Sequence, residues 1–224
     1  VSDENNNSVT CSSEINIIDK EPPVINCAGT QIRNNNTGFC TYIASANEFD
    51  PVIVTDNCSP VTLSNDYNSG NTLNGAVFQK GSNIVTWTVS DTSGNTNSCN
   101  TEIIINDVEN PTIGCNNDQI RNSDLGNCYY QALGNEFDPV TWSDNCIGAA
   151  ISYNLNGATT GNGSLMTGQM FNIGSTTVTW TVTDLSGLTQ TCSFNVNVND
   201  ISVPVPDISI LPDITDECNA SISI

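Results

Sequence analysis

Basic residues are scarce in this sequence, and histidine is absent. The 224 residues include 4 lysines and arginines against 24 aspartates and glutamates, which gives a formal net charge of −20. This charge repels phosphate backbones and anionic lipid surfaces, so we expect neither nucleic acid nor a membrane surface as a partner. No apolar run approaches the roughly 18 residues that span a bilayer, so we expect no membrane insertion.

The motifs of common catalytic sites are missing as well. The sequence has no G-x-S-x-G, no H-E-x-x-H and no phosphate-binding loop. These motifs place nucleophiles, metals and phosphates in most enzymes that carry them. Pairs of carboxylates do occur, but they recur beside turns in small repeated units, whereas a glycosidase needs its pair in a large cleft. We therefore expect a non-catalytic protein that requires no cofactor.

Cysteine, in contrast, is abundant. There are ten cysteines, and none of them forms a C-x-x-C pair. Without such pairs and without histidine, a zinc site is disfavoured and disulfides are favoured, and disulfides persist in oxidising compartments. We therefore expect an extracellular protein at the cell surface.

The cysteines also reveal an internal repeat. Two sets of three have the same spacing, 88 positions apart: Cys27, Cys40 and Cys58 against Cys115, Cys128 and Cys146. The offset rises to 93 between Cys99 and Cys192. Five residues are therefore inserted in the second repeat, and the Gly- and Thr-rich stretch 157–168 is where a loop would accept them.

The repeat boundaries follow from a recurring aspartate. It lies eight residues after the last cysteine of each unit, at Asp19, Asp107 and Asp200. The chain is thus divided into the end of one repeat (1–18), two complete repeats (19–106 and 107–199) and the start of another (200–224). We expect it to be an internal segment of a longer repetitive protein.

Within each repeat the apolar residues follow a period of two. In NIVTWTVSD, the side chains of Val85, Trp87 and Val89 would lie on one face of a strand, and TTVTWTVTD repeats the pattern. The turn sequences D-T-S-G-N and D-L-S-G-L follow these strands and predict hairpins. No stretch shows helical periodicity with caps. About seven short strands in roughly 90 residues predict an all-β fold of tandem antiparallel immunoglobulin-like β-sandwiches in an elongated array.

Several separated elements of each repeat resemble a known family. The frame is D-x(2–3)-P-x-I-x-C, then C, then D-N-C, then V-T-W-T-V-x-D-x-S-G, then a last C. It is similar to the hyalin repeat (HYR), an extracellular immunoglobulin-like module found in sea-urchin hyalin and in long surface proteins of Bacteroidetes, including gliding adhesins. The resemblance covers both complete repeats and the first partial one. It implies a structural or adhesive role, and the Asn-rich, Lys-poor texture favours a bacterial source.

Four cysteines per repeat allow three disulfide connectivities. Cys218 stands near the second-cysteine position of the last partial repeat, whose first-cysteine position is Ile208, so pairing between those two positions is disfavoured. First and last strands commonly lie side by side in a sandwich. The favoured pairs are therefore Cys27 with Cys99, Cys115 with Cys192, Cys40 with Cys58 and Cys128 with Cys146.

Two cysteines are left over by this scheme. We expect Cys11 and Cys218 to be unpaired within this sequence, because their partners would lie in neighbouring repeats. The alternative is that they bond to each other or to another copy of the chain, which would give a covalent polymer.

Acidic residues gather at the repeat junctions and near the third cysteine of each repeat. Carboxylates supply the hard oxygens that Ca²⁺ takes in sets of about six to eight. The candidate ligands are Asp19, Glu21, Glu48, Asp50, Asp56, Asp107, Glu109, Glu136, Asp138 and Asp144. The hypothesis is that Ca²⁺ stiffens the junctions. The alternative is that these residues cap turns and flank proline, as they do in many β-rich loops.

Trp142 is the candidate ligand-binding residue. Its counterpart in the first repeat is Val54, so the repeat frame does not require an aromatic side chain there. An exposed tryptophan near a loop can stack on a sugar ring.

Three functions remain open. The first is a stalk segment of a long cell-surface adhesin, whose partners are neighbouring repeats of the same chain. The second is a module that binds an extracellular glycan or protein through loops near Trp142. The third is a subunit of a polymerising extracellular filament.

Overall fold

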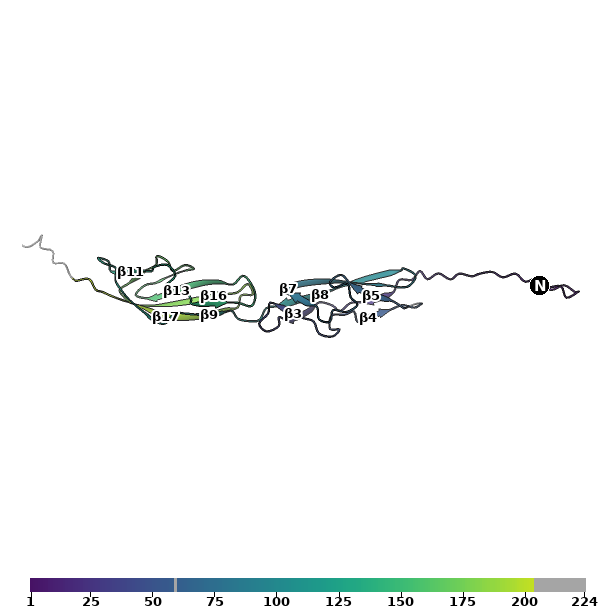
Figure 1. The fold of residues 1–224 in the computed structure, drawn as a ribbon, viewed down its shortest axis with the longest axis horizontal. Coiled ribbons are helices and arrows are strands. Elements are labelled where there is room, and N and C mark those ends of the chain that lie inside the picture. The colour runs from purple at the N-terminus through teal and green to yellow at the C-terminus, as the bar shows by residue number, and fades with distance from the viewer. Residues whose placement is uncertain (59, 204–224) are drawn as a thin grey trace, which may run out of the picture. The chain divides into compact units, whose positions relative to one another are not determined.

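The computed structural model describes residues 1–58 and 60–203, and the strands in this part of the chain account for all its regular structure. It forms two compact units (Figure 1). The first unit comprises Val1–Pro111 with two further segments, Asp144–Ala149 and Asp184–Leu188. The second unit comprises Thr112–Ser143, Ala150–Thr183 and the described part of Thr189–Ile224. Among the described residues there is no helix that is long and apolar enough to cross a membrane.

The first unit contains eight strands. They are β1 (Val24–Asn26), β2 (Gln31–Asn34), β3 (Thr41–Ile43), β4 (Ile53–Thr55), β5 (Thr62–Asn65), β6 (Val77–Gln79), β7 (Gly81–Ser90) and β8 (Thr96–Asn106). One sheet has the order β2-β8-β7-β5, and the pairs β1-β4 and β3-β6 form two small antiparallel sheets. The hairpin of β7 and β8 is closed by a turn in which the backbone N–H of Asp91 donates to the carbonyl of Asn95.

The second unit repeats this plan with one additional strand. Its strands are β9 (Thr112–Gly114), β10 (Gln119–Asn122), β11 (Tyr129–Gln131), β12 (Thr141–Ser143), β13 (Ala150–Gly157), β14 (Gly161–Gly163), β15 (Met170–Asn172), β16 (Gly174–Thr183) and β17 (Thr189–Asn199). The larger sheet has the order β10-β17-β16-β13-β14, and β12-β9 and β11-β15 form the two small sheets.

The inserted residues of the second unit do not form a simple loop. The stretch 157–168 includes β14, which pairs antiparallel with β13 and extends the sheet by one strand. Gly157 ends β13 with a φ of +120°, a left-handed backbone conformation that glycine adopts without strain. The insertion has therefore added an edge strand to the sheet through a hairpin.

Each unit has its own hydrophobic core. In β7, the side chains of Val85, Trp87 and Val89 are fully buried, while Ile84, the residue before Val85, is 64% exposed. The period-two pattern of the sequence thus gives the alternation of buried and exposed faces that a sandwich needs. The all-β, immunoglobulin-like fold class is confirmed.

Not every strand pair is antiparallel. β2 pairs with β8 in parallel, and β10 pairs with β17 in the same way. A parallel pair needs a long connection between its strands, and here the rest of the repeat provides it. The sequence pattern gives strand positions but not this direction of pairing.

Candidate functional site

Two disulfides each connect the start and the end of one sequence repeat. Cys27 is bonded to Cys99, with Cα atoms 5.8 Å apart, and Cys115 to Cys192, with Cα atoms 5.7 Å apart. The last-strand cysteines lie in β8 and β17, directly across from the buried Trp87 and Trp180 of the neighbouring strand. These are the pairs favoured by the sequence, and each one links the first strand region to the central hairpin.

The third disulfide overturns the rest of the predicted pairing. Cys40 is bonded to Cys146, with Cα atoms 4.8 Å apart, whereas Cys58 and Cys128 are free and exposed. The predicted Cys40–Cys58 and Cys128–Cys146 bonds are therefore wrong. The reason is that the segment Asp144–Ala149 packs within the first unit, beside the turn that holds Cys40. The expectation considered pairing only inside each repeat.

The two leftover cysteines have different outcomes. Cys11 is free and exposed, as expected. Cys218 lies outside the described residues.

Three aspartates gather in the first unit, and we call Asp19, Asp56 and Asp91 the first aspartate cluster. One carboxylate oxygen of each lies within 4.8 Å of the others. Asp19 stands between the first partial repeat and β1, Asp56 follows β4, and Asp91 begins the turn between β7 and β8. Three segments far apart in the sequence therefore deliver three negative charges to one place.

Turn hydrogen bonds fix the orientation of these carboxylates. Asp19 Oδ1 accepts the backbone N–H of Glu21 at 3.0 Å, and Asp56 Oδ2 accepts that of Cys58 at 3.0 Å. Asp91 Oδ1 accepts the N–H groups of Ser93 and Asn95. Burial opposes ionisation of Asp91, but these donors and the Asn95 amide outweigh it and lower the pKa of its carboxyl. These aspartates thus do cap turns, which was the alternative to ion binding.

Turn bonds do not satisfy every oxygen of the cluster. Asp19 Oδ2 is buried and has no hydrogen-bond partner among the described residues. A buried carboxylate oxygen without a donor is costly unless a cation or another donor satisfies it. Its environment also acts on the neighbouring thiol, because partial desolvation and the charges of Asp19 and Asp56 raise the pKa of Cys58.

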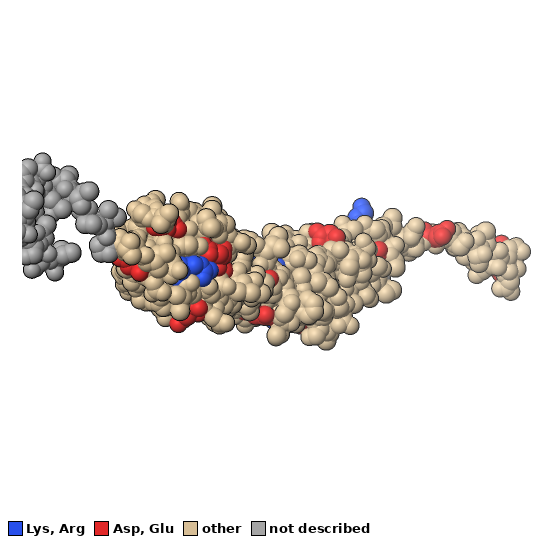
Figure 2. Space-filling model, turned by 60° about the vertical axis from the view of Figure 1, so that its left-hand side comes forward, with Lys and Arg blue, Asp and Glu red and all other residues tan. Residues whose placement is uncertain are grey.

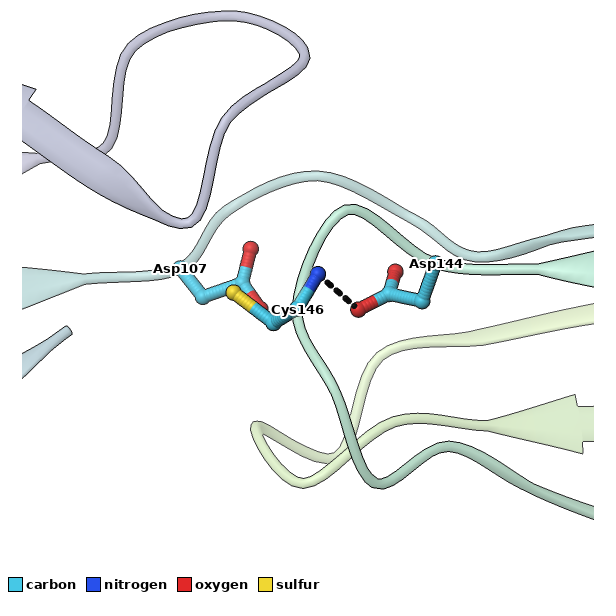
Figure 3. Close-up of side chains that lie close together, drawn as sticks. All are labelled: Asp107, Asp144 and Cys146. Atoms are coloured by element: carbon cyan, nitrogen blue, oxygen red, sulfur yellow. Dashed lines mark hydrogen bonds between the residues drawn. The ribbon is translucent and has the colours of Figure 1, made fainter. Parts of the chain in front are cut away.

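The equivalent positions of the second repeat are Asp107, Asp144 and Asp184. Oxygens of Asp107 and Asp144 lie within 4.8 Å of each other and of the sulfur of Cys146 (Figure 3). The Cys146 sulfur is in a disulfide, so only the carboxylates can act as metal ligands. The backbone N–H of Cys146 donates to Asp144 Oδ2 at 2.9 Å, as in the first cluster.

A lysine reaches this second group. The Nζ atom of Lys80 lies 3.4 Å from Asp107 Oδ2, whose side chain is fully buried, and Ser186 Oγ lies 3.3 Å from the same oxygen. Asp144 Oδ1 and Asp184 Oδ2 are buried without a partner among the described residues. The difference at Asp184 has a simple cause: Leu188 stands where Asn95 supplies an amide to Asp91.

Asp91 and Asp184 were missed by the sequence analysis. Both stand in the repeated phrase V-[ST]-D-x-S-G, which that analysis interpreted only as a hairpin turn. The recurrence of an aspartate at the same turn in every repeat is the signal that could have identified them.

Glu21 and Glu109 lie beside the aspartates and form different hydrogen bonds. Glu21 Oε2 accepts from the side-chain amide of Asn57 at 2.6 Å. Glu109 Oε1 instead accepts the backbone N–H of Gly38 at 2.7 Å. Neither glutamate belongs to an aspartate group whose oxygens lie within 4.8 Å of one another.

The four other predicted ligands lie elsewhere and have structural roles. Glu48 forms an ion pair with Arg33 at 2.9 Å and accepts the hydroxyl of Tyr42. Burial opposes ionisation of Glu48, but its hydrogen bonds and Arg33 lower its pKa, while burial and Glu48 raise the pKa of Tyr42. Glu136, Arg121 and Tyr130 repeat this arrangement in the second unit.

Asp50 and Asp138 also lie apart from the aspartate groups. Asp50 Oδ1 accepts the backbone N–H of Leu73 at 2.9 Å. Burial raises the pKa of Asp138, and its Oδ1 has no partner among the described residues. The prediction that Glu48, Asp50, Glu136 and Asp138 join the junction aspartates in one ion site is therefore wrong.

Trp142 lies in β12 and is 43% exposed. Its strand pairs with β9, where Ile113 is its partner residue. A ligand at this position stays a prediction.

Acidic side chains predominate among the charged groups on the face that Figure 2 shows. Figure 2 shows several separated groups of acidic side chains and few basic ones. This distribution agrees with the large negative charge of the sequence.

Comparisons with known proteins identify the repeat. The HYR domain family model matches residues 18–105 and 106–198. Hyalin from Lytechinus variegatus is 27% identical over 225 residues, which cover 95% of this chain and 37% of that protein. Hyalin from Strongylocentrotus purpuratus is 26% identical over 212 residues, which cover 92% of this chain and 16% of that protein. The chain thus spans a minor part of these relatives.

Solved structures give a weaker likeness. Mouse cadherin-23 EC22-24 has a TM-score of 0.39 and 16% identity, with 82% of this chain and 66% of that chain covered. The titin I-band fragment I67-I69 has a TM-score of 0.39 and 13% identity, with 81% and 67% covered. These TM-scores are too low to support a functional inference.

The sequence comparisons carry the assignment. Two adjacent matches cover most of the chain, and the hyalin relatives together with three disulfides indicate extracellular repeat domains of the adhesion type. The chain belongs to the HYR domain family.

Proposed function

We propose that this chain is a non-catalytic stalk segment of a longer extracellular adhesion protein, in which disulfide-closed repeats carry mechanical load. The observation that carries the proposal is the position of the disulfides. The Cys27–Cys99 bond encloses a separation of 72 residues, and the Cys115–Cys192 bond one of 77 residues. When force is applied to the two ends of the chain, these bonds carry it. Most residues of each core lie between the bonded cysteines and are therefore not stretched.

Separate cores support the same role. The buried residues of the first core lie between Ala44 and Ile105, and those of the second between Ala132 and Val198. Repeats that each bury their own core contribute stability nearly independently, and a stalk can then be extended by adding units.

Single-molecule extension tests the load-bearing role. In a C40S/C146S background, the oxidised chain should lengthen little when the first repeat opens, because the Cys27–Cys99 bond holds the core segment. Adding C27S/C99S should release the 72-residue separation, which is roughly 240 Å of extended chain. Measurement of contour length by optical tweezers distinguishes the two. An oxidised background chain that also lengthens by this amount would contradict the proposal.

We further propose that the first aspartate cluster binds a divalent cation such as Ca²⁺. Three carboxylates approach one another, and the buried Asp19 Oδ2 has no donor among the described residues. Within that part of the chain, neither Asp19 nor Asp91 forms an ion pair. Hard oxygen ligands of this kind suit Ca²⁺ or Mg²⁺. At the second group, the ammonium of Lys80 already supplies a positive charge to Asp107, which makes the first cluster the better site.

Thermal unfolding with and without a chelator tests this site. A ligand present at 100 times its dissociation constant stabilises the folded state by about 2.7 kcal/mol. For a repeat of about 90 residues, Ca²⁺ should then raise Tm by roughly 10 to 20 °C over EGTA. D19N should abolish most of this shift. E4Q, which removes one charge from an exposed residue outside the cluster, should keep it. An equal midpoint in Ca²⁺ and in EGTA would exclude the ion.

A further inference from the structure

We propose that Cys58 and Cys128 each form a disulfide with a cysteine of a neighbouring repeat. Each of these bonds is equivalent to the Cys40–Cys146 bond. In this arrangement the second cysteine of each repeat bonds to the third cysteine of the following repeat. The disulfide partner of Cys58 is therefore the second-position cysteine of a preceding repeat. The partner of Cys128 is the third-position cysteine of a following repeat.

The spacing assigns each free cysteine to one half of the observed bond. Cys128 lies 88 positions after Cys40, and Cys146 lies 88 positions after Cys58. The observed Cys40–Cys146 bond joins the second position of one repeat to the third position of the next. The same rule leaves the third position of the first repeat and the second position of the second repeat without a partner in this sequence, and these are the two free cysteines.

The turn at Cys58 has one hydrogen bond in common with the turn at bonded Cys146. In each, the backbone N–H of the cysteine donates to Oδ2 of the aspartate two residues before it, at 3.0 Å from Cys58 and 2.9 Å from Cys146. The exposure differs, since Cys146 is 4% exposed whereas Cys58 is exposed. The Cys58 turn is thus preformed for a bond that would bury it.

The turn at Cys128 likewise matches the turn at bonded Cys40. The residue four positions before each cysteine, Asn36 or Asp124, donates its backbone N–H to the carbonyl of the residue after the cysteine. Its side chain accepts an N–H from the residue three positions after the cysteine, at 2.7 Å for Asn36 and 3.0 Å for Asp124. Both cysteines also accept a backbone N–H through their carbonyls from the segment before the long central strand.

Hydrogen bonds beside the Cys40–Cys146 bond show what a completed junction contains. Asn145 Nδ2 donates to the carbonyl of Phe39 at 3.0 Å, and Gly38 donates its N–H to Glu109 at 2.7 Å. The residues equivalent to Asn145 and Glu109 in the first repeat are Asn57 and Glu21. These two are hydrogen-bonded to each other at 2.6 Å.

This exchange of partners supports the assignment of Cys58. In the completed junction, the amide of Asn145 and the carboxylate of Glu109 contact the turn of the preceding repeat. Where no such turn is present, the equivalent groups of Asn57 and Glu21 bond to each other. Gly38, whose N–H Glu109 accepts, has its equivalent in Gly126 at the Cys128 turn, with a φ of +75° against +77° at Gly38. Both open halves therefore carry the contact groups of the junction as well as its cysteine.

The chemistry of the bond is an oxidation of two thiols. Each thiol loses one proton and one electron as the S–S bond forms, and a disulfide oxidant such as oxidised glutathione takes up the two electrons and two protons to give two thiols. Extracellular compartments maintain such bonds. The consequence is a covalent bond at each junction, additional to the chain itself.

Mixing of single-cysteine variants tests the pairing rule. In a C11S/C218S background, the full chain keeps only Cys58 and Cys128 as free thiols outside the three bonds. The C58S and C128S variants of this background are mixed in a glutathione redox buffer at high protein concentration, because tethering in an array replaces concentration there. Products are separated without reduction and mapped by mass spectrometry of disulfide-linked peptides.

We expect a heterodimer joined from Cys128 of one copy to Cys58 of the other, in at least tenfold excess over either homodimer. Heterodimer yield no greater than the homodimer yields would overturn the proposal. Peptide mapping of the unmixed chain provides a second, independent outcome. Recovery of Cys40 linked to Cys58 and of Cys128 linked to Cys146, in place of the Cys40–Cys146 peptide, would also overturn it.

Discussion

Replacement of Cys27 and Cys99 by serine is expected to lower the free energy of unfolding of the first repeat by about 4 kcal/mol, the value that the chain-entropy relation gives for a loop of this size. The bond closes a separation of 72 residues, so its loss gives the unfolded chain many more conformations. Its Cys99 also lies directly across from Trp87 in the hairpin of β7 and β8. Most single substitutions in a domain remove less stability than the loss of this bond.

Differential scanning calorimetry of the full chain measures this effect for each repeat. The C27S/C99S variant should lower one transition and leave the other at its original temperature, because the two cores share no buried residue. The matched C115S/C192S variant should do the reverse, since its bond closes a separation of 77 residues in the second repeat. If either variant lowered both transitions by the same amount, the repeats would not be independent folding units.

Much of the fold could be predicted from the sequence because the repeat restates the same pattern twice. The alternation around Trp87 and Trp180 defines the central strands, and both indoles are fully buried. The family resemblance is confirmed by the two HYR matches. The bacterial and gliding context, the repeat boundaries and the ligand at Trp142 stay predictions.

The parts that sequence reasoning missed are those decided by tertiary proximity. Spacing shows that Cys40 and Cys58 belong to one repeat, but it does not show which loops meet. Residues 144–149 lie within the first unit, which brings Cys146 to Cys40 instead. The same is true of Asp91, whose turn role explains its presence fully until the fold places it beside Asp19 and Asp56. A residue with one sufficient local explanation is easily given no second role.

A further large effect is expected from the two core tryptophans, which differ in one hydrogen bond. Trp180 Nε1 donates to the carbonyl of Phe137 at 2.9 Å, whereas Trp87 Nε1 is buried with no partner among the described residues. Truncation to alanine removes the same buried ring in both repeats and typically costs about 3 to 5 kcal/mol. W180A also leaves the Phe137 carbonyl without this donor, which adds about 1 to 3 kcal/mol.

W87A carries no such additional cost in stability. The indole N–H that it removes has no hydrogen-bond partner among the described residues, so no acceptor is left unsatisfied. We therefore expect W180A to lower the free energy of unfolding of the second repeat by about 1 to 3 kcal/mol more than W87A lowers that of the first repeat. Chemical denaturation of the full chain, followed by circular dichroism, measures both values. W180F and W87F separate the hydrogen bond from the lost volume, because phenylalanine keeps most of the ring and lacks the N–H. The difference should persist in the phenylalanine pair. Equal losses for W180F and W87F would show that the bond to Phe137 contributes nothing to stability, and that the packing of each ring alone sets its cost.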